Sequence, residues 1–445
     1  MIIAKFGGTS VADAAAIKRL VSIIASRRED RPVVVVSALA RMTDALLDLE
    51  HAGATIDNRL TTILERHQTV AAELALPPAV IGRIEEDVSA LRQWLLVRAG
   101  SHWRPFESDH VVSHGELWSS RLVTAALEAA GVPSRWVDAR HVVVTDARFT
   151  KAAPQLDEIR RRARQIIPPL TEAGTVPVTQ GFIGATADGQ TTTLGRGGSD
   201  YTASLLGAAL DAQRVEIWTD VDGILSADPR IVPDAHLLAE ASYHEAAELA
   251  AFGAKVLHPA TQSPLVDAGI PCWVLNSFAP DRPGTRIVAG ARPTFVGNSP
   301  VRSIAWKRGI TIINVRAPRR LGAVEFLQQL FGVFANHGVA VDVLASSEVN
   351  VSVTIDGSTE RTGLLRDLQA LGTVTVLDGR AIVAVIGVDL RGSRGLSARL
   401  FHAVRDVNIE VISQGASEIN VTFVVREEDG PAAVKALHQE FFSAA

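Results

Sequence analysis

Short apolar runs rich in β-branched residues alternate with segments of helical periodicity along the first part of the chain, and this alternation constrains the fold most. Residues 33–37 and 215–219 have the composition of buried strands. Residues 122–130 and 243–252 have the pattern of helices, and a glycine follows each of them. Alternation of this kind predicts an α/β fold with a mainly parallel sheet and helices on both faces.

Prolines and glycines punctuate the stretch between residues 279 and 300 and mark the end of this first part. We predict a first domain over residues 1–288, whose last strand includes residues 286–288, and a linker over 289–300. Residues 54–108 look mostly helical and polar, and we predict that they form an inserted helical subdomain. Because 445 residues exceed one ordinary core, further domains are expected beyond the linker.

The last third of the chain contains an internal repeat with an offset of 70 residues. The matching pairs are Phe331 and Phe401, Val341 and Val411, Ser347 and Ser417, Glu348 and Glu418, Asn350 and Asn420, Val351 and Val421, and Ser352 and Thr422. Each copy is predicted to contain a helix, a strand, a polar turn and a strand of alternating apolar residues. We therefore predict two small α/β domains packed side by side, over residues 301–378 and 379–445.

Composition excludes several classes of protein. The net charge of −5, from 44 basic and 49 acidic residues, argues against a nucleic-acid-binding surface, which needs a basic patch. No apolar run approaches membrane-spanning length, and the early charge at Lys5 argues against a signal peptide. The single cysteine, Cys272, has apolar neighbours and no partner for an internal disulfide, so we expect a core thiol and a cytoplasmic protein.

Residues 191–200, TTTLGRGGSD, have the character of an anion-binding segment. Three glycines surround Arg196, so backbone N–H groups can approach a ligand closely beside a planar cation. Ser199 or Asp200 is expected to cap the helix that follows, and the start of that helix also favours an anion.

Residues 2–11, IIAKFGGTSV, form a second such segment. Lys5 ends a predicted strand, Gly7 and Gly8 break it, and Ser10 or Asp13 is the expected cap of the next helix. This arrangement suits phosphate, although it lacks the Gly-Lys-Ser/Thr of the Walker pattern.

Both segments belong to a series of motifs that resembles aspartate kinase over essentially the whole chain. The motifs, in the order of that family, are KFGGTS (5–10), SHGE (113–116), TLGRGGSD (193–200), WTDVDGI (218–224) and GAKVLHP (253–259). The first would suit the wider amino-acid kinase superfamily, whereas the second and third are more specific for aspartate as phosphoryl acceptor. The two copies of the repeat look like ACT domains, the regulatory amino-acid-binding modules of this family.

The resemblance implies transfer of a phosphoryl group from ATP to the side-chain carboxylate of L-aspartate, which gives 4-phospho-L-aspartate. This is the first step of lysine, threonine and methionine biosynthesis. The acceptor is already ionised, so catalysis depends on positioning and on neutralising charge between two anions. The residues that the resemblance assigns to catalysis are Lys5, Lys255 and Asp200, and those that it assigns to the substrate are Thr43, Glu116, Arg196 and Ser199.

Arg196 suits a carboxylate, most naturally the α-carboxylate, and Glu116 suits the α-ammonium. The alternative for Glu116 is an acid stabilised by the start of a helix. His114 is expected to be structural rather than a proton carrier.

For the nucleotide, the resemblance implies the following contacts: Lys5, Gly7, Gly8, Ser37, Thr219, Asp220, Leu225, Arg230 and Lys255. Asp220, helped by Asp200, is expected near Mg²⁺, which keeps several waters and needs few protein ligands. Relatives usually carry a tyrosine at the position of Leu225, where it packs on adenine, so this chain loses a stacking contact.

The ACT pair implies feedback by an end-product amino acid, lysine or threonine in this family. Asp342, Ser346, Ser347 and Glu348 are the predicted effector residues. The basic loop over residues 315–322 leaves the identity of the effector open. Because ACT modules favour side-by-side pairing, we expect a homodimer or a dimer of dimers.

Two other functions stay open at this point. One is a kinase for glutamate or a related acid, against which the pair Glu116 and Arg196 argues, because it suits a free α-amino acid. The other is an amino-acid sensor with an inactive kinase domain. The intact Lys5, Arg196, Asp220 and Lys255 argue against it.

Overall fold

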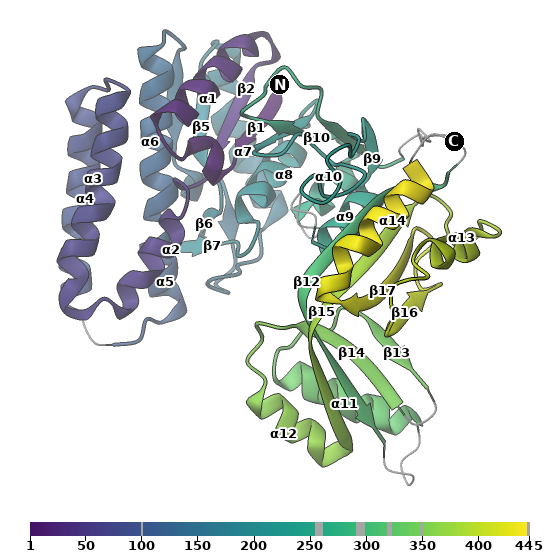
Figure 1. Ribbon diagram of the computed structural model, residues 1–445. Coiled ribbons are helices and arrows are strands. Elements are labelled where there is room, and N and C mark those ends of the chain that lie inside the picture. Colours follow the sequence, from purple (N-terminus) through teal and green to yellow (C-terminus); the bar gives the residue numbers. More distant parts are fainter. Residues whose placement is uncertain (99–100, 254–260, 291–298, 318–322, 348–349, 443–445) are drawn as a thin grey trace. The chain divides into compact units, whose positions relative to one another are not determined.

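The computed structural model describes residues 1–98, 101–253, 261–290, 299–317, 323–347 and 350–442 (Figure 1). The chain divides into two compact units, and each is described by itself. Unit 1 comprises Met1–Ile224, Ala239–Ala246 and Val256–Arg292. Unit 2 comprises Leu225–Leu238, Ala247–Lys255 and Pro293–Ala445.

Unit 1 is built on an eight-stranded, mainly parallel sheet. Its strands are β1 (Ile2–Phe6), β2 (Pro32–Val36), β3 (Ser134–Val137), β5 (Val176–Gln180), β8 (Val215–Thr219), β9 (Glu240–Ser242), β10 (Cys272–Asn276) and β11 (Thr285–Val288). The order is β3-β5-β2-β1-β8-β10-β11-β9, and β10 and β11 form the antiparallel pair. Every residue of β1 and β2 is buried, as their apolar composition predicts for central strands.

Helices cover both faces of this sheet (Figure 1). Among the helices of unit 1 are α1 (Ala14–Ser26), α2 (Met42–Leu47), α5 (Pro105–Val112), α6 (His114–Ala129), α7 (Leu156–Glu172), α8 (Gly198–Ala209) and α10 (Ser263–Ala268), whereas α9 (Tyr243–Ala251) begins in unit 1 and ends in unit 2. Ala4 and Phe6 of β1 pack in one core cluster with α1 and α6. Successive side chains of a strand point to opposite faces, and Lys5 accordingly meets Asp200 of α8. The predicted α/β class is confirmed.

Two smaller parts complete unit 1. The stretch predicted to be helical, 54–108, contains α3 (Ile56–Glu73) and α4 (Pro78–Leu96), which lie side by side (Figure 1). A second, three-stranded sheet has the order β4-β6-β7, with β4 (Val144–Thr145), β6 (Ile183–Thr186) and β7 (Thr191–Thr193). β7 leads directly into the glycine-rich segment with Arg196.

Unit 2 contains a six-stranded antiparallel sheet and the internal repeat. Its elements are β12 (Val301–Arg316), α11 (Ala323–Asn336), β13 (Leu344–Ser346), β14 (Asn350–Asp356), α12 (Thr362–Leu371), β15 (Thr373–Gly387), α13 (Leu396–Ala403), β16 (Val411–Gln414), β17 (Asn420–Arg426) and α14 (Gly430–Phe442). The sheet order is β13-β14-β12-β15-β17-β16. β14 and β17 begin and end 70 residues apart, as the repeat predicts.

The two copies have separate hydrophobic cores but share their longest strands. One core contains Phe326 and Leu330 of α11 with Ile313 of β12. The other contains Phe423 of β17 with Val301 and Ile304, which come from the first half of the same strand β12. β12 pairs with β15 along its length, with register shifts after Val301 and between Lys307 and Ile312. Each long strand therefore supplies both cores, and the domain boundary at 378/379 stays a prediction.

Loop Leu225–Leu238 packs within unit 2. Ala227 and Val232 belong to the core of the second copy. The Ser303 hydroxyl donates to the Leu225 carbonyl at 2.7 Å, and the Ile304 N–H donates to the Ser226 carbonyl at 2.8 Å. This stretch of the chain, in which nucleotide contacts are predicted at Leu225 and Arg230, is thus fixed by the part of the sequence that contains the repeat.

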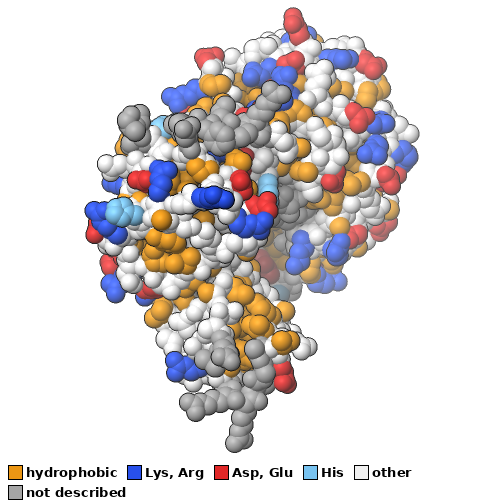
Figure 2. All heavy atoms as spheres, turned by 90° about the vertical axis from the view of Figure 1, so that its right-hand side faces the viewer, with side chains coloured by type: hydrophobic (Ala, Val, Ile, Leu, Met, Phe, Trp, Pro, Cys, Tyr) orange, Lys and Arg blue, Asp and Glu red, His pale blue; other side chains and the backbone are white. Residues whose placement is uncertain are grey.

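The surface carries both signs of charge. Figure 2 shows Lys and Arg side chains interspersed with Asp and Glu over the face that it presents, as the near-balance of 44 basic and 49 acidic residues leads one to expect. Among the described residues, none of the helices has the length and apolar character needed to cross a membrane.

Candidate active site

A cavity of about 760 Å³ opens in unit 1 where several strand ends and helix starts meet. Its lining combines the end of β1, the loop after β2, α5, the first turn of α6 and the segment from Thr193 to Asp200. The predicted site residues that line it are Lys5, Gly8, Ser37, Thr43, Glu116, Arg196, Ser199 and Asp200. Motifs nearly 200 residues apart in the sequence therefore lie around one cavity.

Lys5 is held by an ion pair at the cavity. Its Nζ lies 2.6 Å from Oδ1 of Asp200, and the two side chains are 10% and 18% exposed. Gly7 follows β1 with an extended backbone, and a Cβ there would lie 3.4 Å from the Lys5 Nζ. The ammonium is thus kept in place at the end of a parallel strand, where α/β sheets bind ligands.

The glycine-rich segment forms the start of α8 around two left-handed glycines, Gly195 with φ +76° and Gly197 with φ +74°. The prediction that Ser199 or Asp200 caps this helix is wrong. Gly197 occupies the N-cap position, without a side-chain cap, and Asp200 lies in the first turn and pairs with Lys5 instead. First-turn N–H groups without a capping side chain suit an anion.

Glu116 is the most perturbed acid of the cavity. It is 3% exposed in the first turn of α6, and among the described residues its Oε2 has no hydrogen-bond partner. Burial raises the pKa of this carboxyl from its ordinary 4.5 to about 8, and hydrogen bonds from the Ala38 and Glu116 backbones offset part of that rise. A buried carboxylate oxygen without a partner, at the wall of a cavity, calls for a cationic ligand.

Arg196 and Thr43 complete the polar lining. Arg196 is exposed at the cavity, and no ion pair to it is found within the described part of the chain. Thr43 is half-buried in the first turn of α2. A guanidinium and a buried acid that line one cavity match the two charged groups of an α-amino acid.

The other predicted nucleotide residues lie outside the cavity lining. Thr219 ends β8, and its hydroxyl hydrogen-bonds to the exposed Asp220 carboxylate at 3.2 Å. Arg230 is exposed in unit 2 and pairs with Asp228 at 2.6 Å. Leu225 is half-buried in the same unit, and Lys255 lies outside the described residues.

Asp109 is a residue of the cavity that the motifs did not reveal. It is 1% exposed on α5, and its carboxylate accepts hydrogen bonds from the Thr193 N–H (3.0 Å), the Thr193 hydroxyl (2.7 Å) and the Thr150 N–H (2.8 Å). Burial raises the pKa of the Asp109 carboxyl, and these hydrogen bonds act in the opposite direction. Asp109 therefore fastens the end of β7, and with it the start of the Arg196 segment, to α5.

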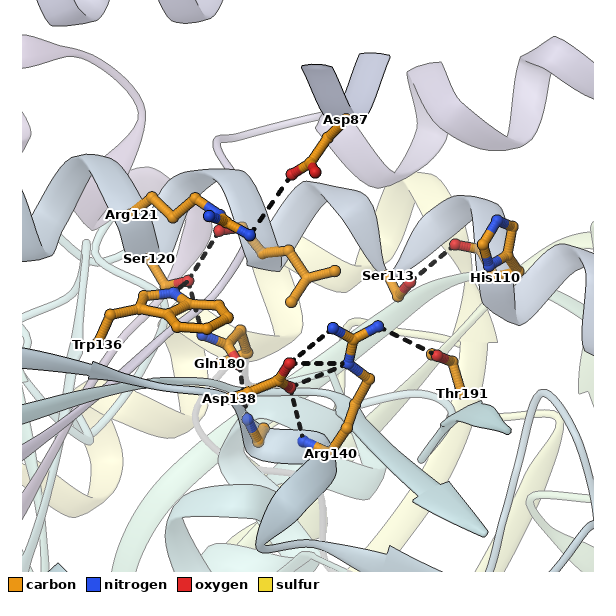
Figure 3. A network of polar contacts seen from close by, with 12 residues as sticks. Asp87, His110, Ser113, Ser120, Arg121, Trp136, Asp138, Arg140, Gln180 and Thr191 are labelled. Carbon is orange, nitrogen blue, oxygen red and sulfur yellow. Dashed lines mark hydrogen bonds and ion pairs between the residues drawn. The ribbon is translucent and has the colours of Figure 1, made fainter. Parts of the chain in front are cut away.

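A network of polar contacts also holds β7 and α6 in place (Figure 3). The Arg140 guanidinium binds both carboxylate oxygens of Asp138 and reaches the Thr191 hydroxyl of β7 at 3.5 Å. Ser120, one turn after Glu116 on α6, accepts hydrogen bonds from Gln180 Nε2 at 2.7 Å and Trp136 Nε1 at 2.8 Å. These contacts fix α6, which bears Glu116, and β7, which leads to Arg196.

Three histidines, one of them in the SHGE motif, form a series of tilted and edge-to-face ring contacts with two tryptophans. The order of the ring contacts is Trp94, His110, His114, Trp118 and His67. Burial lowers the pKa of His67, His110 and His114 from 6.5 to about 4. His114 Nδ1 lies 2.9 Å from the His110 carbonyl, which fits the structural role expected for it.

Comparison with known proteins identifies the family. Residues 1–276 match the amino acid kinase family, and residues 383–441 match an ACT domain. The chain is 39% identical to lysine-sensitive aspartokinase 3 of Escherichia coli strain K12, and the match covers 99% of both chains. The chain belongs to the aspartokinase family. Aspartokinase 1 of Arabidopsis thaliana, a chloroplastic enzyme, is 36% identical over 98% of this chain and 79% of its own length.

Solved structures of the aspartokinase family agree with this assignment. The structure of E. coli aspartokinase III in complex with aspartate and ADP, described as the R-state, matches with a TM-score of 0.86 at 38% identity. The match covers 100% of both chains. A second structure of that enzyme, with lysine and aspartate in the T-state, gives the same values.

The residues predicted to bind an effector lie around β13 in unit 2. Asp342 forms an ion pair with Lys307 of β12 at 2.8 Å, and both side chains are 23% exposed. Ser346 ends β13, and Ser347 follows in a turn in which its N–H donates to the Asn350 carbonyl at 2.8 Å. Glu348 lies outside the described residues.

Proposed function

We propose that this member of the aspartokinase family transfers the γ-phosphoryl group of ATP to the side-chain carboxylate of L-aspartate and releases 4-phospho-L-aspartate and ADP. This reaction is the first step of lysine, threonine and methionine biosynthesis, and the ACT copies make it subject to amino-acid feedback. The E. coli relative bound to aspartate and ADP supports both substrates.

The observation that carries the proposal is the charge pattern of the cavity. A buried Glu116 with an unpartnered oxygen suits the α-ammonium, and the exposed Arg196 suits the α-carboxylate. Thr43 and Ser199 add hydroxyl donors. Lys5 then meets the transferring phosphoryl group, so that its charge offsets the repulsion between the acceptor carboxylate and the nucleotide.

The nucleotide is proposed to contact Gly7, Gly8 and Ser37 through backbone and hydroxyl donors, and Thr219, Asp220, Leu225, Arg230 and Lys255 elsewhere. Asp220 fits Mg²⁺, because its exposed carboxylate has room for a cation that retains several waters. Asp200 is a weaker candidate, since its Oδ1 lies 2.6 Å from the Lys5 Nζ. Mg²⁺ bound to the phosphates would add positive charge where negative charge gathers during transfer.

The regulatory half is proposed to bind lysine or threonine through Asp342, Ser346, Ser347 and Glu348. An effector ammonium would replace Lys307 as the partner of Asp342. The relative solved with lysine and aspartate supports lysine as the first effector to test. We further propose that the protein is cytoplasmic and forms a homodimer or a dimer of dimers. Light scattering, which measures the mass of the assembly, would distinguish these two oligomeric states.

A hydroxamate trap for the acyl phosphate tests the proposal. With ATP and Mg²⁺ present, aspartate should give the coloured hydroxamate and glutamate should not. Lys5→Met and Arg196→Ala, each checked for native folding, should lower the rate by about a hundredfold or more, because preorganised charges of this kind contribute several kcal/mol. Product with another acid alone would favour a different amino-acid kinase, and no product would favour a sensor.

A further inference from the structure

Arg41 is a cation of the cavity that neither the motifs nor the resemblance assigns. It precedes α2 as its N-cap residue, its side chain is exposed, and it lines the same cavity as Lys5 and Arg196. Its backbone has φ 64° and ψ 9°, which is the left-handed helical region.

This backbone conformation is unfavourable for arginine. An L-residue with a Cβ is strained in the left-handed region, whereas glycine is not. Gly195 and Gly197 adopt this conformation elsewhere in the cavity lining. The local fold would therefore accept glycine at position 41 at least as well, and the backbone gives no reason for an arginine.

The surrounding structure holds the loop before α2 in place. The Ser119 hydroxyl donates to the Ser37 carbonyl at 2.7 Å, and Arg66 Nη1 donates to the Ala40 carbonyl at 2.7 Å. The Met42 N–H closes the turn onto the Leu39 carbonyl at 2.8 Å. Strained backbone clusters at functional sites without being confined to them: Thr150 and Phe182 of the cavity lining share the positive φ, and so do Arg31 and Ala75 outside it.

The guanidinium of Arg41 is also available to a ligand. In the described residues it has no hydrogen bond or ion pair, in contrast to Lys5, which Asp200 holds at 2.6 Å. Thr43, two residues further along, lines the same cavity, together with Ser108 and Val112 of α5. In the chain, Arg41 stands between Ala40, whose Cα would lie 3.5 Å from a Cβ at Gly8, and Thr43, which is assigned above to the acceptor.

We propose that Arg41 binds a carboxylate of the acceptor amino acid and so contributes to its recognition. The inference rests on the proposed function of the cavity. The acceptor has two carboxylates, Arg196 accounts for one of them, and a planar guanidinium makes the bidentate contact that a carboxylate prefers. Arg41 is in this sense a second arginine for a dicarboxylic substrate.

The test compares Arg41→Gly with the wild type and with a matched control. Arg31→Gly removes an exposed arginine that is also left-handed, with φ 52°, and lies outside the cavity lining. Calorimetric titration with L-aspartate measures binding independently of turnover, and initial rates give KM for aspartate and for ATP. Thermal melting of each variant checks that it folds.

Arg41→Gly should melt no lower than the wild type, because it relieves backbone strain, yet weaken aspartate binding about tenfold or more. KM for ATP should stay within about twofold, and Arg31→Gly should change neither constant. An aspartate affinity within twofold of the wild type, or an equal rise in KM for ATP, would overturn the proposal. A wild type that forms no hydroxamate with aspartate would instead refute the proposed function.

Discussion

The raised pKa of Glu116 makes a quantitative prediction about aspartate binding. Before substrate binds, the Glu116 carboxyl is mostly neutral below about pH 8, but the substrate ammonium needs its ionised form. With a pKa of about 8, the ionised fraction is about 1% at pH 6, 9% at pH 7 and 50% at pH 8. The apparent affinity for aspartate should therefore rise about ninefold from pH 6 to 7, about fivefold from 7 to 8, and then level off.

Calorimetry in buffers of different ionisation enthalpy is the decisive assay. Binding of aspartate at pH 7 should release about 0.9 proton per site, because most sites must lose the Glu116 proton, and about half a proton at pH 8. Glu116→Gln should bind more weakly and should release no proton from this position. An affinity that is flat between pH 6 and 8, or proton release that survives in Glu116→Gln, would refute the reasoning.

The same pKa predicts a cost in stability. Glu116 binds its proton more tightly in the folded chain, at about 8, than at its ordinary 4.5, so its favourable contribution is complete below 4.5 and is lost as the pH rises through 8. The difference, at 1.36 kcal/mol per pKa unit, reaches roughly 5 kcal/mol. Glu116→Gln should thus raise the melting temperature relative to the wild type at pH 8.5 and change it little at pH 4.5.

Two further predictions concern groups behind the cavity. Asp109→Asn should lower the free energy of unfolding by about 1–3 kcal/mol and kcat/KM for aspartate by about tenfold, because the oxygen of a neutral amide cannot accept all three hydrogen bonds. Thr193→Val leaves two of these hydrogen bonds and should therefore have the smaller effect, both in urea melts and in kinetics. The pKa is about 4 in the folded chain and about 6.5 in the unfolded chain for three histidines, His67, His110 and His114. Each therefore contributes up to about 3 kcal/mol to the free energy of unfolding above pH 6.5, and this contribution is lost as the pH falls towards 4. Urea melts between pH 7.5 and 4.5 should show this loss, and a His67→Leu variant with the same slope as the wild type would contradict it.

Periodicity and glycine placement predicted much of the fold, because these signals are local. The apolar runs at residues 33–37 and 215–219 became β2 and β8, and the 70-residue repeat became β14 and β17. Asp13 caps α1, as expected, through a 2.8 Å hydrogen bond from the Ala16 N–H. The cap predicted at Ser199 or Asp200 failed, because α8 already begins at Gly198 and both residues lie in its first turn, where Asp200 pairs with Lys5.

The candidate site was predictable where motifs mark it and not elsewhere. Lys5, Glu116 and Arg196 stand in recognisable patterns, and all three line the cavity. Asp109 is an acid within an ordinary helix, and its role depends on β7, which is distant in the sequence. Arg41 has no motif, and its significance depends on a backbone angle that the sequence does not reveal.

The long strands β12 and β15 limit how the regulatory half can be taken apart. A fragment that begins at residue 379 would lack Val301 and Ile304, which fill the core around Phe423. It would expose that apolar surface and an unpaired strand edge, which favours aggregation. An exchange of the ACT pair should therefore keep residues 301–442 together, because β12 and β15 serve both copies, and should preserve the contacts of Ala227 and Val232 with the core of the second copy.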